Sequence, residues 1–112
     1  MDAIEHLTEE SFEAAAGRPG LTVIDFWAGW CGPCRAMAPQ FERAAALRPQ
    51  YRFAKVDVDA EPALAAAYGI RSIPTLMVLR DGTPIAAQAG VVGADELVQA
   101  LDRLDSAHAV AA

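Results

Sequence analysis

Runs of apolar residues with two different periods divide this chain into short strands and helices. Residues 21–27 (LTVIDFW) form an apolar run of strand length, and residues 52–58 alternate between polar and apolar side chains as a strand does. Between them, residues 33–48 read as a helix, which ends before Pro49. A strand, a crossover helix and a second strand predict a βαβ unit, in which the two strands run parallel.

Three shorter elements are predicted from the turn and cap residues around them. Residues 4–7 have the apolar content of a short first strand. Thr8 is a residue type that caps helices, and we expect it to cap a helix that runs through residues 12–16 and stops at Gly17. A further short helix is predicted over residues 61–69, with a proline in its first turn and a glycine at its end.

The last third of the chain predicts a hairpin followed by a helix. Residues 75–80 and 84–89 are two strand-like runs that flank Asp-Gly-Thr at positions 81–83. An Asp-Gly pair between two such runs indicates a tight turn, so these strands are expected to be antiparallel. Residues 93–104 place leucine and valine on one helical face and predict the final helix.

These segments together predict a single α/β domain over residues 1–105. A central mixed sheet of four to five strands is expected, flanked by four helices. Residues 106–112 show no pattern, and we expect them to be a frayed C-terminal tail. The chain has 112 residues, of which 54% are hydrophobic, so it can bury its own core and does not have the composition of a disordered protein.

Composition also limits the partners and the location. The net charge is −6 and there is no basic stripe, which disfavours nucleic acid and anionic membranes as partners. No apolar run approaches the roughly 18 residues of a membrane span. The first residues, MDAIEH, are acidic where a secretory signal is basic. We therefore expect a cytoplasmic protein that binds neither nucleic acid nor a membrane.

The only two cysteines, Cys31 and Cys34, lie between a predicted strand and a predicted helix. Two thiols at this spacing can ligate a metal, form a structural bridge, or cycle between dithiol and disulfide. Zinc needs four ligands, and the only histidines, His6 and His108, lie near opposite ends of the chain. A permanent disulfide across so short a loop restricts the unfolded chain very little, so it would add little stability. We therefore expect no metal site, and a Cys-x-x-Cys pair beside a βαβ unit is typical of a thioredoxin-like redox motif.

The position of the pair predicts a different role for each thiol. The N-terminus of a helix favours an anion, so more of Cys31 is expected to be thiolate and to act as the attacking residue. Cys34 lies one turn further into the helix; we expect it to be more buried and to be the resolving thiol. Helical residues three apart have Cα atoms roughly 5 Å apart, which permits a disulfide. The expected reaction passes through a mixed disulfide between Cys31 and the substrate.

The stretch DFWAGWCGPC at residues 25–34, with Ile-Pro-Thr at residues 73–75, resembles the thioredoxin family. The resemblance extends over residues 4–104. Further matches are Pro39, residues 55–57, residues 68–70, residues 81–82 and Gly90. The resemblance implies the thioredoxin fold and a protein-disulfide reductase with no bound cofactor, whose redox group is the Cys31–Cys34 disulfide. It also implies two partners: disulfide-containing client proteins, and an NADPH-dependent thioredoxin reductase that recharges the pair. We expect a monomer.

Two charged residues are candidates for a supporting catalytic role. Asp25 lies inside an apolar strand, on the same face as Leu21 and Val23, and burial would raise the pKa of its carboxyl. A carboxylate of this kind suits a base that accepts the proton of Cys34, directly or through water. Lys55 lies on the neighbouring strand, and the resemblance makes it the partner of the buried acid. The alternatives are an aspartate turned to solvent and an ordinary exposed strand lysine.

The resemblance also assigns residues that shape the site and bind clients. Gly32 and Pro33 keep bulk away from the sulfurs and are typical of reducing family members, and Trp27 is expected to form a wall of the site. By sequence alone Pro74 is a trans turn proline; the resemblance makes it cis, with the residue before it pairing with an extended client segment. Client docking is expected at an apolar collar made of Trp30, Ile73, Gly90 and Val91. The alternative for each collar residue is ordinary packing.

Two other functions stay open at this point. A thiol oxidase or isomerase is opposed by the Gly-Pro pair between the cysteines and by the acidic N-terminus. A binding module or chaperone subunit with incidental redox activity is compatible with an intact motif. Gly29 stands where some family members carry an acid, and Arg35 stands where lysine is common. Both flank the cysteines, so the redox potential and partner preference remain open.

Overall fold

The computed structural model describes the backbone of residues 4–111 and the side chains of residues 4–107. In this part of the chain, five strands form one mixed sheet and four helices flank it, which confirms the predicted α/β architecture. The elements are, in chain order, β1 (Ile4–His6), α1 (Phe12–Ala16), β2 (Leu21–Trp27), α2 (Gly32–Leu47), β3 (Arg52–Asp57), α3 (Pro62–Ala67), β4 (Thr75–Arg80), β5 (Thr83–Ala89) and α4 (Ala94–Ala111).

The strands lie in the order β1-β3-β2-β4-β5. β2 and β3 run parallel with α2 as their crossover, which confirms the predicted βαβ unit. β4 is antiparallel to both of its neighbours, β2 and β5. The two short or exposed strands, β1 and β5, form the edges, so β2 lies at the centre of the sheet. Both backbone edges of β2 are therefore paired with neighbouring strands, and its side chains point to the two faces of the sheet.

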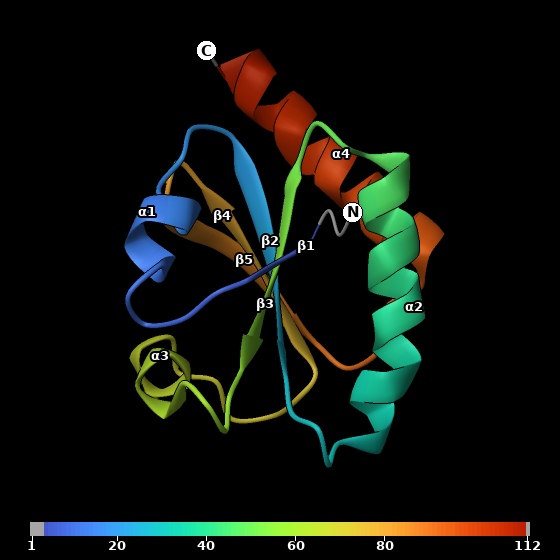
Figure 1. Ribbon diagram of the computed structural model, residues 1–112. Helices are drawn as coiled ribbons and strands as arrows, with labels where there is room; N and C mark the ends of the chain where they lie inside the picture. The colour runs from blue at the N-terminus through green and yellow to red at the C-terminus, as the bar shows by residue number, and fades with distance from the viewer. Residues whose placement is uncertain (1–3, 112) are drawn as a thin grey trace.

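Helices cover both faces of the sheet. α2 and α4 lie on one face, and α1 and α3 lie on the other (Figure 1). Successive residues of a strand point to opposite faces, so β2 contributes to two separate cores. Val23 packs with Phe41 of α2 on one side, and Ile24 packs with Phe12 of α1 on the other. The same alternation places Asp25 on the face covered by α2, which is the helix that carries the cysteines.

The predicted hairpin forms between β4 and β5. Asp81 and Gly82 make its two-residue turn, with φ of 51° and 87°. Positive φ at both positions is what a type I′ turn requires, and the twist of this turn suits an antiparallel pair. A side chain at Gly82 would also bring its Cβ within 3.1 Å of the Gly17 Cα, so the close approach of two loops demands glycine there.

α1 spans the predicted residues 12–16, and Thr8 lies one turn before its first regular residue. The helix begins after Ser11. These two residues bond reciprocally: the Thr8 N–H donates to the Ser11 Oγ at 2.9 Å, and the Ser11 N–H donates to the Thr8 Oγ1 at 3.2 Å. The Thr8 carbonyl also accepts the Phe12 N–H at 3.0 Å, so Thr8 caps this segment from one turn before the regular helix, as predicted.

The end of α4 differs from the prediction. The helix does not stop at Leu104 but continues to Ala111. Residues 105–111 contain three alanines and neither glycine nor proline, so nothing in them breaks a helix that is already formed. The domain boundary at residue 105 and the fraying of the last residues stay predictions, and Ala112 lies outside the described residues.

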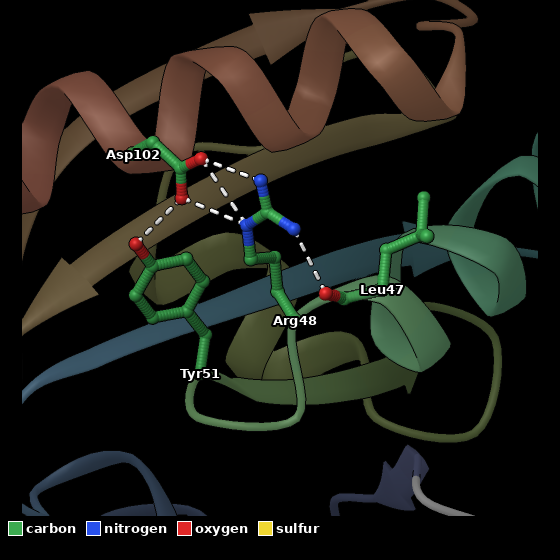
Figure 2. Close-up of polar contacts among 4 residues, drawn as sticks. All are labelled: Leu47, Arg48, Tyr51 and Asp102. Carbon is green, nitrogen blue, oxygen red and sulfur yellow. Dashed lines mark hydrogen bonds and ion pairs between the residues drawn. The ribbon is translucent and has the colours of Figure 1, made fainter.

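A polar cluster joins the end of α2 to α4. Asp102 accepts hydrogen bonds from the Arg48 guanidinium at 2.8 to 3.1 Å and from the Tyr51 hydroxyl at 2.8 Å (Figure 2). Arg48 also donates to the Leu47 carbonyl at the end of the helix. The hydrogen bonds from Arg48 hold the pKa of Asp102 below its usual value, and burial together with Asp102 raises the pKa of Tyr51 to about 12.

Replacing Asp102 with asparagine should lower the thermal stability by about 4 °C at neutral pH, because the charge-assisted bonds to Arg48 and Tyr51 are weakened in a half-exposed setting. A depressed carboxyl pKa contributes stability that is lost as the pH falls through the folded-state value. The difference between the two proteins should therefore vanish in acid. Calorimetry between pH 2 and pH 7 tests this, with Asp105→Asn as a control that removes the same charge one turn away. Equal losses of thermal stability in Asp102→Asn and Asp105→Asn would contradict the stabilising role of the cluster.

Candidate active site

The two cysteines lie at the junction of β2 and α2, as predicted. Cys31 is the cap residue of α2, and its Sγ accepts a hydrogen bond from the Cys34 N–H at 3.2 Å. Pro33 occupies the first turn, where its missing N–H costs nothing. The two sulfurs form a disulfide, with the Cα atoms 5.3 Å apart. The predicted spacing therefore brings the pair together without any rearrangement of the helix.

The cysteines do not differ in exposure. Both side chains are 4% exposed, so the prediction that Cys34 is the more buried residue is wrong. The physical reason is that both sulfurs lie in one small apolar cluster, in which Ala28 and the half-buried Trp27 also pack. What distinguishes the thiols is the helix terminus: only Cys31 is in the cap position, where it accepts a backbone N–H.

A third segment closes over the pair. The Ile73–Pro74 peptide bond is cis, which confirms the prediction from the resemblance, and Pro74 is buried. The carbonyl oxygen of Ile73 lies 3.7 Å from the Cys31 Sγ. The carbonyl oxygen of Pro74 accepts a hydrogen bond from the Gly90 N–H at 2.9 Å. Three distant parts of the sequence thus meet at the disulfide.

The surface beside the disulfide is apolar and exposed. Trp30 is 68% exposed and Val91 is 49% exposed, which makes them two of the three large exposed hydrophobic residues among those described. Ile73 is half-buried and lines a pocket of about 160 Å³ together with Trp30. Of the four predicted collar residues, Ile73 packs against the cysteines, Trp30 directly precedes the first of them, and Gly90 and Val91 lie on the segment that is hydrogen-bonded to Pro74. Neither Trp30 nor Val91 is buried in the core, so packing does not explain them.

The indole of Trp30 is held by a residue that the sequence did not single out. Its Nε1–H donates to the Asp59 Oδ2 at 2.8 Å. Asp59 is placed in turn by Asp57, whose Oδ1 accepts the N–H groups of Asp59 at 2.9 Å and Ala60 at 3.3 Å. This turn follows β3 directly. An Asp-x-Asp sequence after a strand signals such a turn, but nothing in it indicates that the second carboxylate reaches Trp30.

Asp25 is fully buried, as predicted, beneath the helix that carries the cysteines. Neither of its carboxylate oxygens has a hydrogen-bond partner. Burial in these surroundings disfavours the charged form and raises the pKa of Asp25 from 3.8 to about 6, while the charge of Lys55 opposes the rise. At neutral pH the carboxylate is ionised but close to its titration range, which is where a general base works best.

Lys55 lies opposite Asp25 in the register of β2 and β3. It forms no hydrogen bond with the carboxylate, because both oxygens of Asp25 are without partners. Its Nζ lies 4.9 Å from the centre of the Trp27 ring, which is a cation–π contact. A pocket of about 190 Å³ is lined by Lys55, Trp27, Cys34 and Arg35, so the lysine borders an opening toward the second cysteine.

Two negative findings concern the described residues alone. Among them, no group of three or more His, Cys, Asp or Glu side chains could hold a metal ion. The side chain of His108, which entered the ligand count above, lies outside the described residues. No helix that the structure describes is long and apolar enough to cross a membrane.

Comparison with known proteins agrees with this geometry. A model of the thioredoxin family matches residues 3–103. The chain belongs to the thioredoxin family. The sheet, its four helices and the Cys-x-x-Cys disulfide are those of a thioredoxin fold. The predicted thiol–disulfide oxidoreductase activity is therefore confirmed at the level of the family.

Relatives from several bacteria support the assignment to the thioredoxin family. The chain is 45% identical to "Putative thioredoxin 2" of Streptomyces coelicolor, over 82% of this chain and 69% of that protein. It is 44% identical to "Thioredoxin C-3" of Corynebacterium nephridii, over 92% of this chain and 71% of that protein. It is 39% identical to "Thioredoxin" of Staphylococcus aureus, over 90% of this chain and 97% of that protein.

Proposed function

We propose that the chain is a protein-disulfide reductase in which Cys31 is the nucleophile and Cys34 is the resolving thiol. The observation that carries the proposal is the cap position of Cys31, whose Sγ accepts the Cys34 N–H. In the reduced protein the same donor and the helix dipole favour a thiolate at Cys31. Among the described residues, no N–H donates to the Cys34 sulfur, and Cys34 is within reach of the Cys31 sulfur.

The proposed reaction has two exchanges. The Cys31 thiolate attacks one sulfur of a client disulfide, which forms a mixed disulfide and releases the other client sulfur as a thiolate. The Cys34 thiolate then attacks the Cys31 Sγ, which forms the intramolecular disulfide and releases the second client sulfur. Two electrons pass from the protein to the client, and the Cys31–Cys34 disulfide seen in this structure is the product state.

Asp25 is proposed as the base of the second exchange. Cys34 must lose its thiol proton before it attacks, and a buried carboxylate with a pKa of about 6 can accept that proton. Lys55 is proposed to keep the carboxylate ionised at neutral pH, because its charge lowers the pKa of Asp25. The opening beside Lys55 and Cys34 provides a route for water to carry the proton.

Clients are proposed to bind on the apolar surface beside the disulfide. The backbone of Ile73, next to the cis-proline Pro74, can pair with an extended client segment by strand addition. Trp30 and Val91 offer apolar contact without charged groups of their own, which suits clients of varied sequence. Gly90 joins this surface through the hydrogen bond from its N–H to the Pro74 carbonyl, and its φ of 92° is one that glycine adopts without strain.

The pair must be reduced again after each turnover, and we propose an NADPH-dependent thioredoxin reductase as the donor. Membership of the thioredoxin family and the Gly-Pro pair between the cysteines support this proposal. A cytoplasmic location, a monomeric state and the absence of a bound cofactor are proposed on the same basis. A binding module with incidental redox activity is the competing function.

Insulin reduction separates these functions. We expect the protein to accelerate the reduction of insulin by dithiothreitol, followed as turbidity, and to lose this activity in Cys31→Ser. The redox potential of the pair, measured against a glutathione buffer, is expected to lie below the glutathione poise. A more oxidising potential would favour an oxidase or isomerase, and a redox couple without insulin turnover would favour the binding module.

A further inference from the structure

The loop that carries Gly90 and Val91 is anchored at both ends by backbone hydrogen bonds. On one side the Gly90 N–H donates to the Pro74 carbonyl at 2.9 Å. On the other side the Val92 N–H donates to the Met37 Sδ at 3.3 Å, in a buried position. Val92 itself is buried, whereas Val91 between the two anchors is half exposed. The exposed valine is therefore presented from a backbone that is held on both sides.

The helix that follows this loop is capped from outside. Gly93 occupies the cap position of α4, since its carbonyl accepts the Leu97 N–H at 2.9 Å. Glycine has no side chain with which to cap the free N–H groups of the first turn. The Ala94 N–H instead donates to the Gln40 Oε1 at 2.9 Å. A side chain of α2 thus supplies the acceptor that the local sequence of α4 lacks.

Both acceptors come from the helix that begins at the redox pair. Met37 and Gln40 are three residues apart on α2, so they lie on the same face, which is turned toward α4. Met37 is fully buried. A thioether sulfur accepts a hydrogen bond, and a leucine of similar volume at that position does not. The residue types therefore fit the hydrogen bonds as well as the packing.

We propose that Met37 and Gln40 are positioning residues for client docking. They hold the segment from Val92 to Ala94 against α2 and so fix Val91 relative to Cys31, at the start of the same helix. The inference rests on the proposed reductase function. A protein client that contacts Val91 needs this fixed position, whereas a small disulfide reaches the sulfurs without touching the loop.

Kinetics with two substrates test the proposal. In Met37→Leu and in Gln40→Leu, we expect the KM for insulin to rise about threefold to tenfold, because each variant loses one hydrogen bond that holds the loop. The kcat, and the rate with the small disulfide DTNB, should stay within about twofold of the wild type. Hydrogen exchange at the Val92 and Ala94 amides should become faster in the corresponding variant, because each amide loses its acceptor.

Two further variants separate positioning from stability. Gln40→Glu keeps an acceptor oxygen and should retain the wild-type KM. Adding Gly93→Ser to Gln40→Leu supplies a local cap to α4, and no atom lies within 4 Å of the new Cβ. This double variant should regain thermal stability but keep the raised KM.

Four results would overturn the inference. An unchanged KM in both leucine variants, or its recovery by the serine cap, would leave Met37 and Gln40 with a structural role alone. Equal losses with insulin and DTNB would point to damage at the cysteines. If the wild type reduces DTNB but not insulin, the proposed reductase function itself fails and this inference falls with it.

Discussion

Cys34→Ser should convert the protein into a covalent trap for its clients. Cys31 keeps its place at the end of α2 and can still attack a disulfide, but no second thiol remains to release the product. Catalytic turnover of insulin should fall to the uncatalysed rate, while a mixed disulfide accumulates one to one. Mass spectrometry of the reduced variant mixed with insulin measures the adduct, and its loss on addition of dithiothreitol confirms the bond.

The matched control is Cys31→Ser, which should form almost no adduct. This comparison matters because the two cysteines are equally buried, so exposure alone does not say which of them attacks. The assignment depends on the cap position, in which the Cys34 N–H points at the Cys31 sulfur. Serine at position 34 keeps this backbone donor, so the variant tests the thiol and leaves the helix terminus intact. Equal adducts in both variants would reverse or abolish the proposed roles.

Asp25→Asn should stabilise the protein at neutral pH by up to about 3 kcal/mol. A pKa raised from 3.8 to about 6 in the fully buried carboxyl corresponds to that free energy, at about 1.4 kcal/mol for each pKa unit. Above pH 6 the folded wild type must hold an ionised, unpartnered carboxylate, and the asparagine variant holds a neutral amide. The gain is reduced by whatever hydrogen bonds the buried amide fails to make.

The sign of the pH dependence is fixed by the raised pKa. Between pH 4 and pH 6 the folded protein binds more protons at Asp25 than the unfolded chain does, so stability falls as the pH rises through this window. Urea unfolding at pH 3.5, 5 and 7 should show the two proteins converging in acid. In Lys55→Gln the fall in stability with rising pH should extend to higher pH, because the charge of Lys55 no longer lowers the pKa of Asp25. A constant difference at all pH values would contradict this account.

The same substitution should slow the second exchange. Wild-type turnover is expected to rise as Asp25 ionises near pH 6, and the variant should lose this rise. Stopped-flow measurement of client release from the mixed disulfide, between pH 6 and pH 9, isolates that step. Rates equal to those of the wild type over this range would exclude Asp25 as the base, even if the stability prediction holds.

Most elements and the position of the redox pair follow from local patterns in the chain. The bounds of β2 and β4 agree with the apolar runs that predicted them, and the Asp81-Gly82 turn follows from the residue types that tolerate positive φ. These features depend on periodicity and on contacts between residues close in sequence, which a single chain displays directly. The cis form of Pro74 could be predicted only through the family resemblance. The residues alone favour trans, since most bonds before proline are trans.

Contacts between side chains far apart in the sequence depend on the packing of the whole fold. Trp30 forms a hydrogen bond with Asp59, which is 29 positions away, and Arg48 forms hydrogen bonds with Asp102, which is 54 positions away. The same holds for the bond from Val92 to Met37, across 55 positions. The equal burial of the two cysteines has the same origin, since the cluster that covers them includes Ile73 from a remote loop. Such pairs leave no pattern in the nearby sequence, because a polar residue that bonds a distant side chain has the same local sequence as one that faces water.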